Sequence, residues 1–131
     1  MKLILMVRRK IGLSHKEFRE YYESKHVPLA LRLLPFFSEY ERNYPDQNEK
    51  YAPVHVVNAA AEPGFDVITE ICFESRADYD RMLVALADPE IGRLMAEDED
   101  KFIDRSCISM YLVEECTTSR ERLGRGSDRL Q

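Results

Sequence analysis

The segment from Ser14 to Leu34 constrains the fold most, because its residue pattern is that of one long helix with a histidine on the apolar face. Ser14 is a typical helix N-cap, and Glu17, three residues later, completes a capping box. Apolar and aromatic residues then recur at spacings of three and four, which places them on one helical face. This row consists of Phe18, Tyr22, His26, Leu29 and Leu33.

His26 is the polar member of this row, and a proline follows it two residues later. Because Pro28 lacks a backbone N–H, we expect it to kink or end the helix near His26. Such a break would turn the imidazole toward a cavity, where a group with a pKa near 6.5 can take up and release protons. The alternatives are a core histidine whose nitrogens are both satisfied, or a histidine exposed to solvent.

Length and composition indicate one soluble globular domain. The chain has 131 residues, 44% of them hydrophobic and 33% charged, which suits a single core. A net charge of −5 argues against a nucleic-acid surface, which needs a basic face. No apolar run approaches the roughly 20 residues of a membrane span, and the first run is too short for a signal peptide. Three cysteines without CxxC spacing are typical of reduced thiols in a cytoplasmic protein: Cys72, Cys107 and Cys116.

Short apolar or alternating runs predict four strands, at residues 2–9, 38–44, 65–73 and 107–115. Two further helices are predicted at 75–87 and 90–102, separated by Asp88-Pro89. The order is then β-α-β-β-α-β, an α+β ferredoxin-like fold with a four-stranded antiparallel sheet and its helices on one face. The helix at 75–87 is expected to bury Tyr79, Met82, Leu83 and Leu86.

The two faces of the predicted sheet should differ. In the strand at 65–73 one face carries Phe65, Val67, Thr69, Ile71 and Phe73, which suits packing against helices. The other face is expected at solvent or in a polar pocket, and it carries Asp66, Ile68, Glu70 and Cys72. Taken together, the strands have too many apolar residues for an uncovered face. We therefore expect a second subunit to cover it and to enclose a barrel-like cavity as the ligand site.

Three other segments carry candidate functional residues or partner contacts. The long connection at 45–64 reads as a lid or binding loop, contains His55, and has an apolar patch at 54–57 that could pair as a strand extension. The acidic run at 97–100 is either a solvated face or the source of one carboxylate for the site. Residues 117–131 are expected to form a flexible tail, or one ordered only by a partner subunit.

The sequence resembles the EthD-domain family of the dimeric α+β barrel superfamily over roughly residues 2–115, which gives a domain at 1–116. The segments that carry the resemblance are KLILMVRRKIGLSHKEFREYYESKHVPLA, FDVITEICFES and DEDKFIDR. It implies a ferredoxin-like homodimer and varied activities: dehydratases, cyclases, decarboxylases, an isomerase and accessory roles in ether degradation. It also implies a catalytic role for His26, assisted by residues at the positions of Tyr40, His55 and Cys72.

These residues suit proton-transfer chemistry without a cofactor, and the resemblance implies a small hydrophobic, aromatic or polyketide-like oxygenated substrate. We hypothesise that His26 is the general acid/base, that Tyr40 or Tyr22 polarises an oxygen, and that Asp66 or Glu70 orients the imidazole. A non-catalytic ligand-binding dimer that assists an oxygenase is the alternative function, and a monooxygenase is a third. A metal site of His26, His55 and Glu70 lacks the usual ligand spacing, so no metal is expected.

Overall fold

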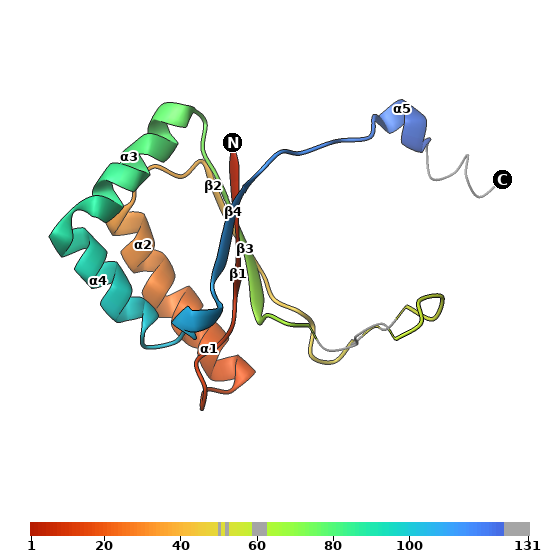
Figure 1. Ribbon diagram of the computed structural model, residues 1–131, viewed down its shortest axis with the longest axis horizontal. Helices are drawn as coiled ribbons and strands as arrows, with labels where there is room; N and C mark the ends of the chain where they lie inside the picture. Colours follow the sequence, from red (N-terminus) through yellow and green to blue (C-terminus); the bar gives the residue numbers. More distant parts are fainter. Residues whose placement is uncertain (50, 52, 59–62, 125–131) are drawn as a thin grey trace.

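The computed structural model describes residues 1–49, 51, 53–58 and 63–124. It contains a four-stranded antiparallel sheet in the order β2-β3-β1-β4, with helices packed on one face (Figure 1). The predicted α+β ferredoxin-like fold is therefore confirmed. The strands are β1 (Lys2–Val7), β2 (Glu39–Asn43), β3 (Val67–Cys72) and β4 (Ser109–Val113).

The helical layer is built from one long helix with a π-turn near its middle and from one pair of shorter helices. The first predicted helix is α1 (His15–Tyr21), a π-helical turn, η1 (Tyr22–His26), and α2 (Val27–Leu33). The second pair is α3 (Arg76–Ala87) and α4 (Pro89–Glu99), which ends three residues before the predicted boundary. A short 3₁₀ turn (Arg105–Cys107) precedes β4, and a one-turn helix, α5 (Arg120–Leu123), follows it.

Local sequence sets the helix starts as expected. The Ser14 hydroxyl accepts from the Glu17 N–H, and the Glu17 carboxylate accepts from the Ser14 N–H, both at 3.0 Å. At the start of α3, the Ser75 hydroxyl accepts from the Asp78 N–H at 3.2 Å. Asp88 ends α3 and also caps α4, accepting from the first N–H groups of that helix at 3.0 and 3.1 Å.

The expected disturbance at Pro28 takes the form of a π-turn. The Val27 N–H donates to the Tyr22 carbonyl five residues back, because Pro28 has no N–H to continue an α-helical ladder and its ring crowds the preceding turn. One extra residue in the turn offsets about 100° of helical rotation. The buried row consequently runs at spacings of four: Phe18, Tyr22, His26, Ala30 and Leu34.

That shift corrects one prediction of the sequence. Leu29 and Leu33 were expected in the buried row, but both are only half-buried. A second correction concerns α3, where Met82 is buried as expected while Leu83 is 44% exposed. Leu83 lies at the edge of the predicted stripe, where the helix surface turns toward solvent.

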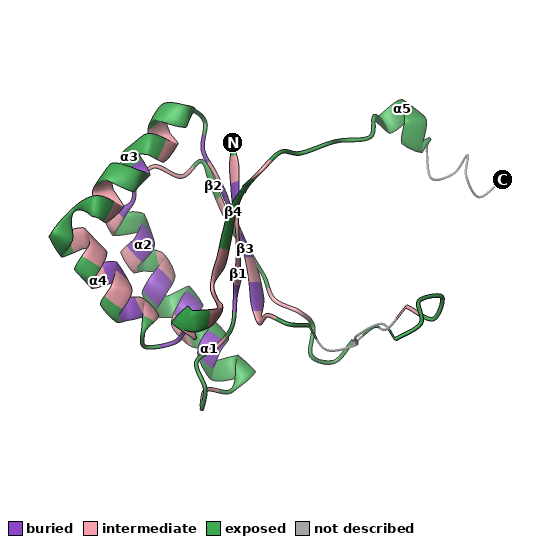
Figure 2. Cartoon of the chain, in the orientation of Figure 1, coloured by how far each residue is buried: buried purple, intermediate pink, exposed green. Residues whose placement is uncertain are grey.

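The alternation of β3 holds as predicted. Val67, Thr69 and Ile71 are buried under the helices, whereas Ile68, Glu70 and Cys72 alternate onto the opposite face. Figure 2 shows buried residues on the helix faces turned toward the sheet. Two clusters make up this core, one around Leu3, Ile71 and Met82 and the other around Phe18 and Phe102.

The described residues leave uncovered the face of the sheet that is turned away from the helices. The described parts of the β2–β3 connection and of the segment after β4 both extend on that side (Figure 1). The patch at 54–57 forms turns rather than the strand extension that was considered, and Val54 is 99% exposed. Residues 50, 52, 59–62 and 125–131, which include parts of the predicted binding loop and tail, lie outside the described residues.

Candidate functional site

A mostly apolar cavity of about 180 Å³ lies between the helices and the helix-facing side of the sheet. Side chains from all four strands and from α2, α3 and α4 line it, and it sits between the two core clusters. Its polar lining comes from four residues: Tyr22, His26, Tyr40 and Glu99. The hollow that His26 faces is thus formed within the single chain, and the cavity between two sheets that the sequence predicts stays a prediction.

His26 is held by a carboxylate from α4, the last helix of the helical layer. Its Nδ1 lies 2.8 Å from Asp98 Oδ2, and the Tyr21 hydroxyl donates to Asp98 Oδ1 at 2.6 Å. Both His26 and Asp98 are buried. Because an ionised carboxylate only accepts, this contact assigns the imidazole proton to Nδ1 and leaves the Nε2 lone pair for a ligand in the cavity.

The surroundings keep the His26 ring neutral and fixed. Burial lowers the pKa of His26 below its ordinary value, and the hydrogen bond to Asp98 partly opposes that effect. Phe102, which is fully buried, packs against the imidazole with ring centroids 4.9 Å apart. The geometry is that of a neutral imidazole base whose charged form would be stabilised by an adjacent carboxylate.

Two tyrosine hydroxyls border the same cavity. Tyr22 Oη lies 2.8 Å from the Thr69 hydroxyl, and Tyr40 donates to Tyr22 Oη over a long 3.4 Å contact. Burial raises the pKa of Tyr22 and of Tyr40, so both remain protonated donors at neutral pH. The weak bond leaves the Tyr40 hydroxyl able to turn toward a ligand oxygen.

A charged network behind Tyr40 holds its strand against the helix. The Arg42 guanidinium makes a two-pronged ion pair with Glu23 at 2.8 and 2.9 Å, and it lies 4.7 Å from the Tyr40 ring centroid. Tyr44 donates to the same carboxylate at 2.6 Å. Tyr40, Arg42 and Tyr44 therefore share one face of β2, as expected from strand alternation, and that face is turned toward the helical layer.

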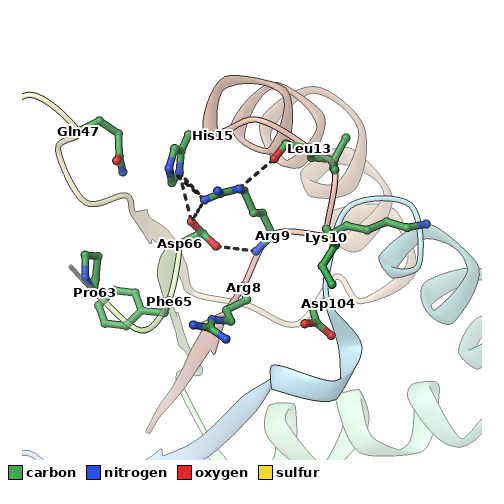
Figure 3. Close-up of a pocket in the computed structure, with 12 residues that line it drawn as sticks. Arg8, Arg9, Lys10, Leu13, His15, Gln47, Pro63, Phe65, Asp66 and Asp104 are labelled. Carbon is green, nitrogen blue, oxygen red and sulfur yellow. Dashed lines mark hydrogen bonds and ion pairs between the residues drawn. The ribbon is translucent and has the colours of Figure 1, made fainter.

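Asp66 lies in a different place, a surface hollow of about 450 Å³ beyond the end of β1. Figure 3 shows its carboxylate turned toward Arg9 and His15. It accepts from the Arg9 N–H and from the Arg9 guanidinium, both at 2.8 Å. The pair extends the β1–β3 ladder, because the Asp66 N–H also donates to the Val7 carbonyl. Asp66 does not line the cavity of His26.

The other predicted residues are not gathered at this cavity either. Glu70 and Cys72 lie on the uncovered face of the sheet, where Glu70 pairs with Lys2 at 3.3 Å. His55 is exposed in the β2–β3 connection. The cavity therefore brings together Tyr22, His26 and Tyr40 and none of the four others. Within the described residues, no three His, Cys, Asp or Glu side chains are placed to hold a metal ion.

Sequence reasoning did not single out Asp98 as the partner of His26, because 72 residues separate them. The acidic run at 97–100 was expected to be a solvated face or to give one carboxylate to a site. The helical period of α4 offers a usable signal. Asp98 follows the buried Met95 by three residues and therefore lies on the inward side of the helix. Glu97, by contrast, pairs with Arg93 at the surface.

Fold and site together define a ferredoxin-like α+β protein with a mostly apolar cavity under its helices that contains a few polar side chains. The model of the EthD domain matches residues 10–106, which is most of the chain. The protein therefore belongs to the EthD domain family, and the resemblance in its sequence is confirmed.

The individual relatives share only low sequence identity with this chain. The chain is 28% identical over 108 residues to the conidial pigment biosynthesis dehydratase EthD of Metarhizium robertsii. The matched segment covers 79% of this chain and 74% of that protein. An EthD family protein from Bacillus halodurans shares 19% identity at a TM-score of 0.58, covering 88% of this chain and 97% of its own. A protein from Arabidopsis thaliana shares 16% identity at a TM-score of 0.55, covering 90% and 97%. These two structures support the fold.

None of the helices in the described ranges has the length and apolar character needed to cross a membrane. The three cysteines are all free thiols.

Proposed function

We propose that the protein is a cofactor-independent lyase of the dehydratase type that acts on a small oxygenated substrate in the cavity under its helices. The observation that carries this proposal is the buried contact of His26 Nδ1 with Asp98, which leaves Nε2 as a base beside apolar walls. The similarity to a relative named as a dehydratase supports the reaction class.

The roles follow from the contacts. His26 Nε2 accepts the proton next to a substrate carbonyl, and Asp98 stabilises the imidazolium that forms. The Tyr40 hydroxyl donates to the oxygen on which enolate charge develops, with Tyr22 behind it. This proposal uses Asp98 in the orienting role that the sequence had offered to Asp66 or Glu70, and it assigns no step to His55 or Cys72.

Cavity size and lining support a proposal for the substrate class. A cavity of about 150 Å³ with aliphatic and aromatic walls is large enough for benzene, so 180 Å³ suits roughly one substituted ring. The few polar groups fix a carbonyl and a leaving oxygen, while the walls favour hydrophobic bulk. We therefore infer an aromatic or polyketide-like substrate of about that size.

We also propose that the protein works as a homodimer in which a second copy covers the open face of the sheet. That face carries Ile4, Met6, Ile68 and Tyr111 among charged residues. Chain segments project beyond it on the side away from the helices (Figure 1), as arms around a partner would. Light scattering of the purified protein tests this, and a monomer at micromolar concentration would contradict it.

The test of the proposed function uses β-hydroxycyclohexanone, a single-ring ketone whose dehydration gives an enone with strong ultraviolet absorbance. The wild-type protein should accelerate its dehydration, and His26→Ala should lose about a hundredfold or more. His15→Ala is the matched control, because His15 lies in the surface hollow with Arg9 and Asp66. If wild-type protein binds cyclohexenone but turns over no β-hydroxy ketone, the accessory ligand-binding role is correct instead.

A further inference from the structure

The cavity contains a carboxyl group that the mechanism above does not use. Glu99 lies in the last turn of α4, directly after Asp98, and lines the same cavity as His26. Its side chain is half-buried. Among the described residues, none donates a hydrogen bond to its carboxyl group, whereas the neighbouring Glu97 is held by Arg93 at 2.9 Å.

The surroundings of Glu99 favour its protonated form. Burial raises the pKa of Glu99 above its ordinary value, and the nearby Asp100 and Asp98 act in the same direction, while Arg105 opposes them. Arg105 is itself engaged with Asp100 at 3.2 Å. A carboxyl group against an apolar cavity without a protein partner is unfavourable for stability, which points to a functional reason for its position.

We propose that Glu99 is the general acid that protonates the leaving hydroxyl of the substrate, with His26 as the base. This inference rests on the proposed function and adds the second half of an acid–base pair. The cavity supplies the two groups that an elimination needs, one that removes a proton from carbon and one that gives a proton to oxygen.

The step balances with these two residues alone. The C–H bond next to the carbonyl breaks, its proton passes to His26 Nε2, and its electron pair forms the carbon–carbon double bond. The C–O bond at the β carbon breaks, and the Glu99 proton joins the departing hydroxide, which leaves as water. Proton transfer from the imidazolium to the Glu99 carboxylate, through water, restores both starting forms.

The experiment separates the acid from the base by changing the leaving group. Three rates are measured for each variant: dehydration of β-hydroxycyclohexanone, elimination of chloride from β-chlorocyclohexanone, and exchange of the carbon-bound proton of the hydroxy ketone in D₂O. Chloride departs without a proton, and exchange needs only the base. Glu99→Gln should therefore slow dehydration about a hundredfold or more, with the other two rates within about threefold of wild type.

Glu97→Gln is the matched control, because it makes the same change on the exposed side of the same helix, and all three of its rates should equal those of wild type. The inference is overturned if Glu99→Gln slows all three reactions alike, or slows none. Normal rates in His26→Ala, or no exchange with wild-type protein, would instead overturn the proposed function and the inference with it. Circular dichroism of Glu99→Gln checks that the fold is kept.

Discussion

Replacing Asp98 by asparagine tests the central contact of the site without removing an atom from it. The amide of Asp98→Asn has the same shape and can still accept the 2.6 Å bond from Tyr21. Toward His26, however, an amide nitrogen in place of Oδ2 would be a donor at 2.8 Å from Nδ1. Nδ1 must then accept, so the imidazole proton moves to Nε2 and the lone pair that faces the cavity is lost.

Two effects set the expected magnitude. A hydrogen bond to a charged partner contributes about 1.5–3 kcal/mol, and its loss from the imidazolium formed in the reaction slows proton removal by roughly ten- to a hundredfold. The wrong tautomer adds to this, and in serine proteases the equivalent change slows turnover about 10⁴-fold. We expect carbon-proton exchange in β-hydroxycyclohexanone to slow by about 10²- to 10⁴-fold.

Nitrogen-15 NMR of the imidazole measures the tautomer directly, independently of any substrate. The wild-type ring should show the proton on Nδ1, and Asp98→Asn should show it on Nε2. Tyr21→Phe is the control: it removes the other bond to Asp98 but keeps the carboxylate at His26, so the tautomer stays and the exchange rate falls by about tenfold or less. An unchanged tautomer together with wild-type exchange in Asp98→Asn would refute the assignment of His26 as a positioned base.

Three further outcomes follow from the same structure. Phe102→Ala removes a fully buried ring and should lower the free energy of unfolding in urea by about 3–5 kcal/mol, against less than about 0.5 kcal/mol for Leu83→Ala. Tyr40→Phe should slow dehydration about tenfold or more while leaving cyclohexenone binding within a few-fold, since its hydroxyl acts on developing charge. Folding raises the pKa of Glu99, so at a pH above the ordinary glutamate pKa the folded protein binds more protons than the unfolded chain. The free energy of unfolding therefore falls as the pH rises through the pKa of Glu99 in the folded protein. Glu99→Gln should consequently raise the melting temperature more at about pH 8 than at about pH 5.

Local signals predicted the secondary structure because the responsible contacts are local. The capping residues Ser14, Ser75 and Asp88 sit within a few residues of the groups that they cap. The alternation along β3 likewise follows from strand geometry alone. Pro28 predicted a disturbance in the first helix but not its form, because a kink and a π-turn are both ways to accommodate the missing N–H.

The site was harder to predict because it is assembled by tertiary packing. His26 could be selected for its place in an apolar row, but Asp98 reaches it only when α4 packs against the first helix. Asp66, Glu70 and Cys72 were grouped with it because they share a polar sheet face that we expected to border the cavity. The observed cavity is on the other face, beneath the helices, where Tyr22 and Tyr40 lie.

The π-turn has a consequence for how relatives of this protein should be compared. A π-turn contains one residue more than the α-helical turn that it replaces, so the pair Tyr22 and His26 could keep its inward direction with one residue fewer between them. Chains that present a tyrosine and a histidine at a spacing of three can thus build the same pair as this chain does at a spacing of four. In a sequence alignment, a gap opposite Ser24, which is exposed, would then mark a change from a π-turn to an α-helical turn. The tyrosine and histidine pair would be kept.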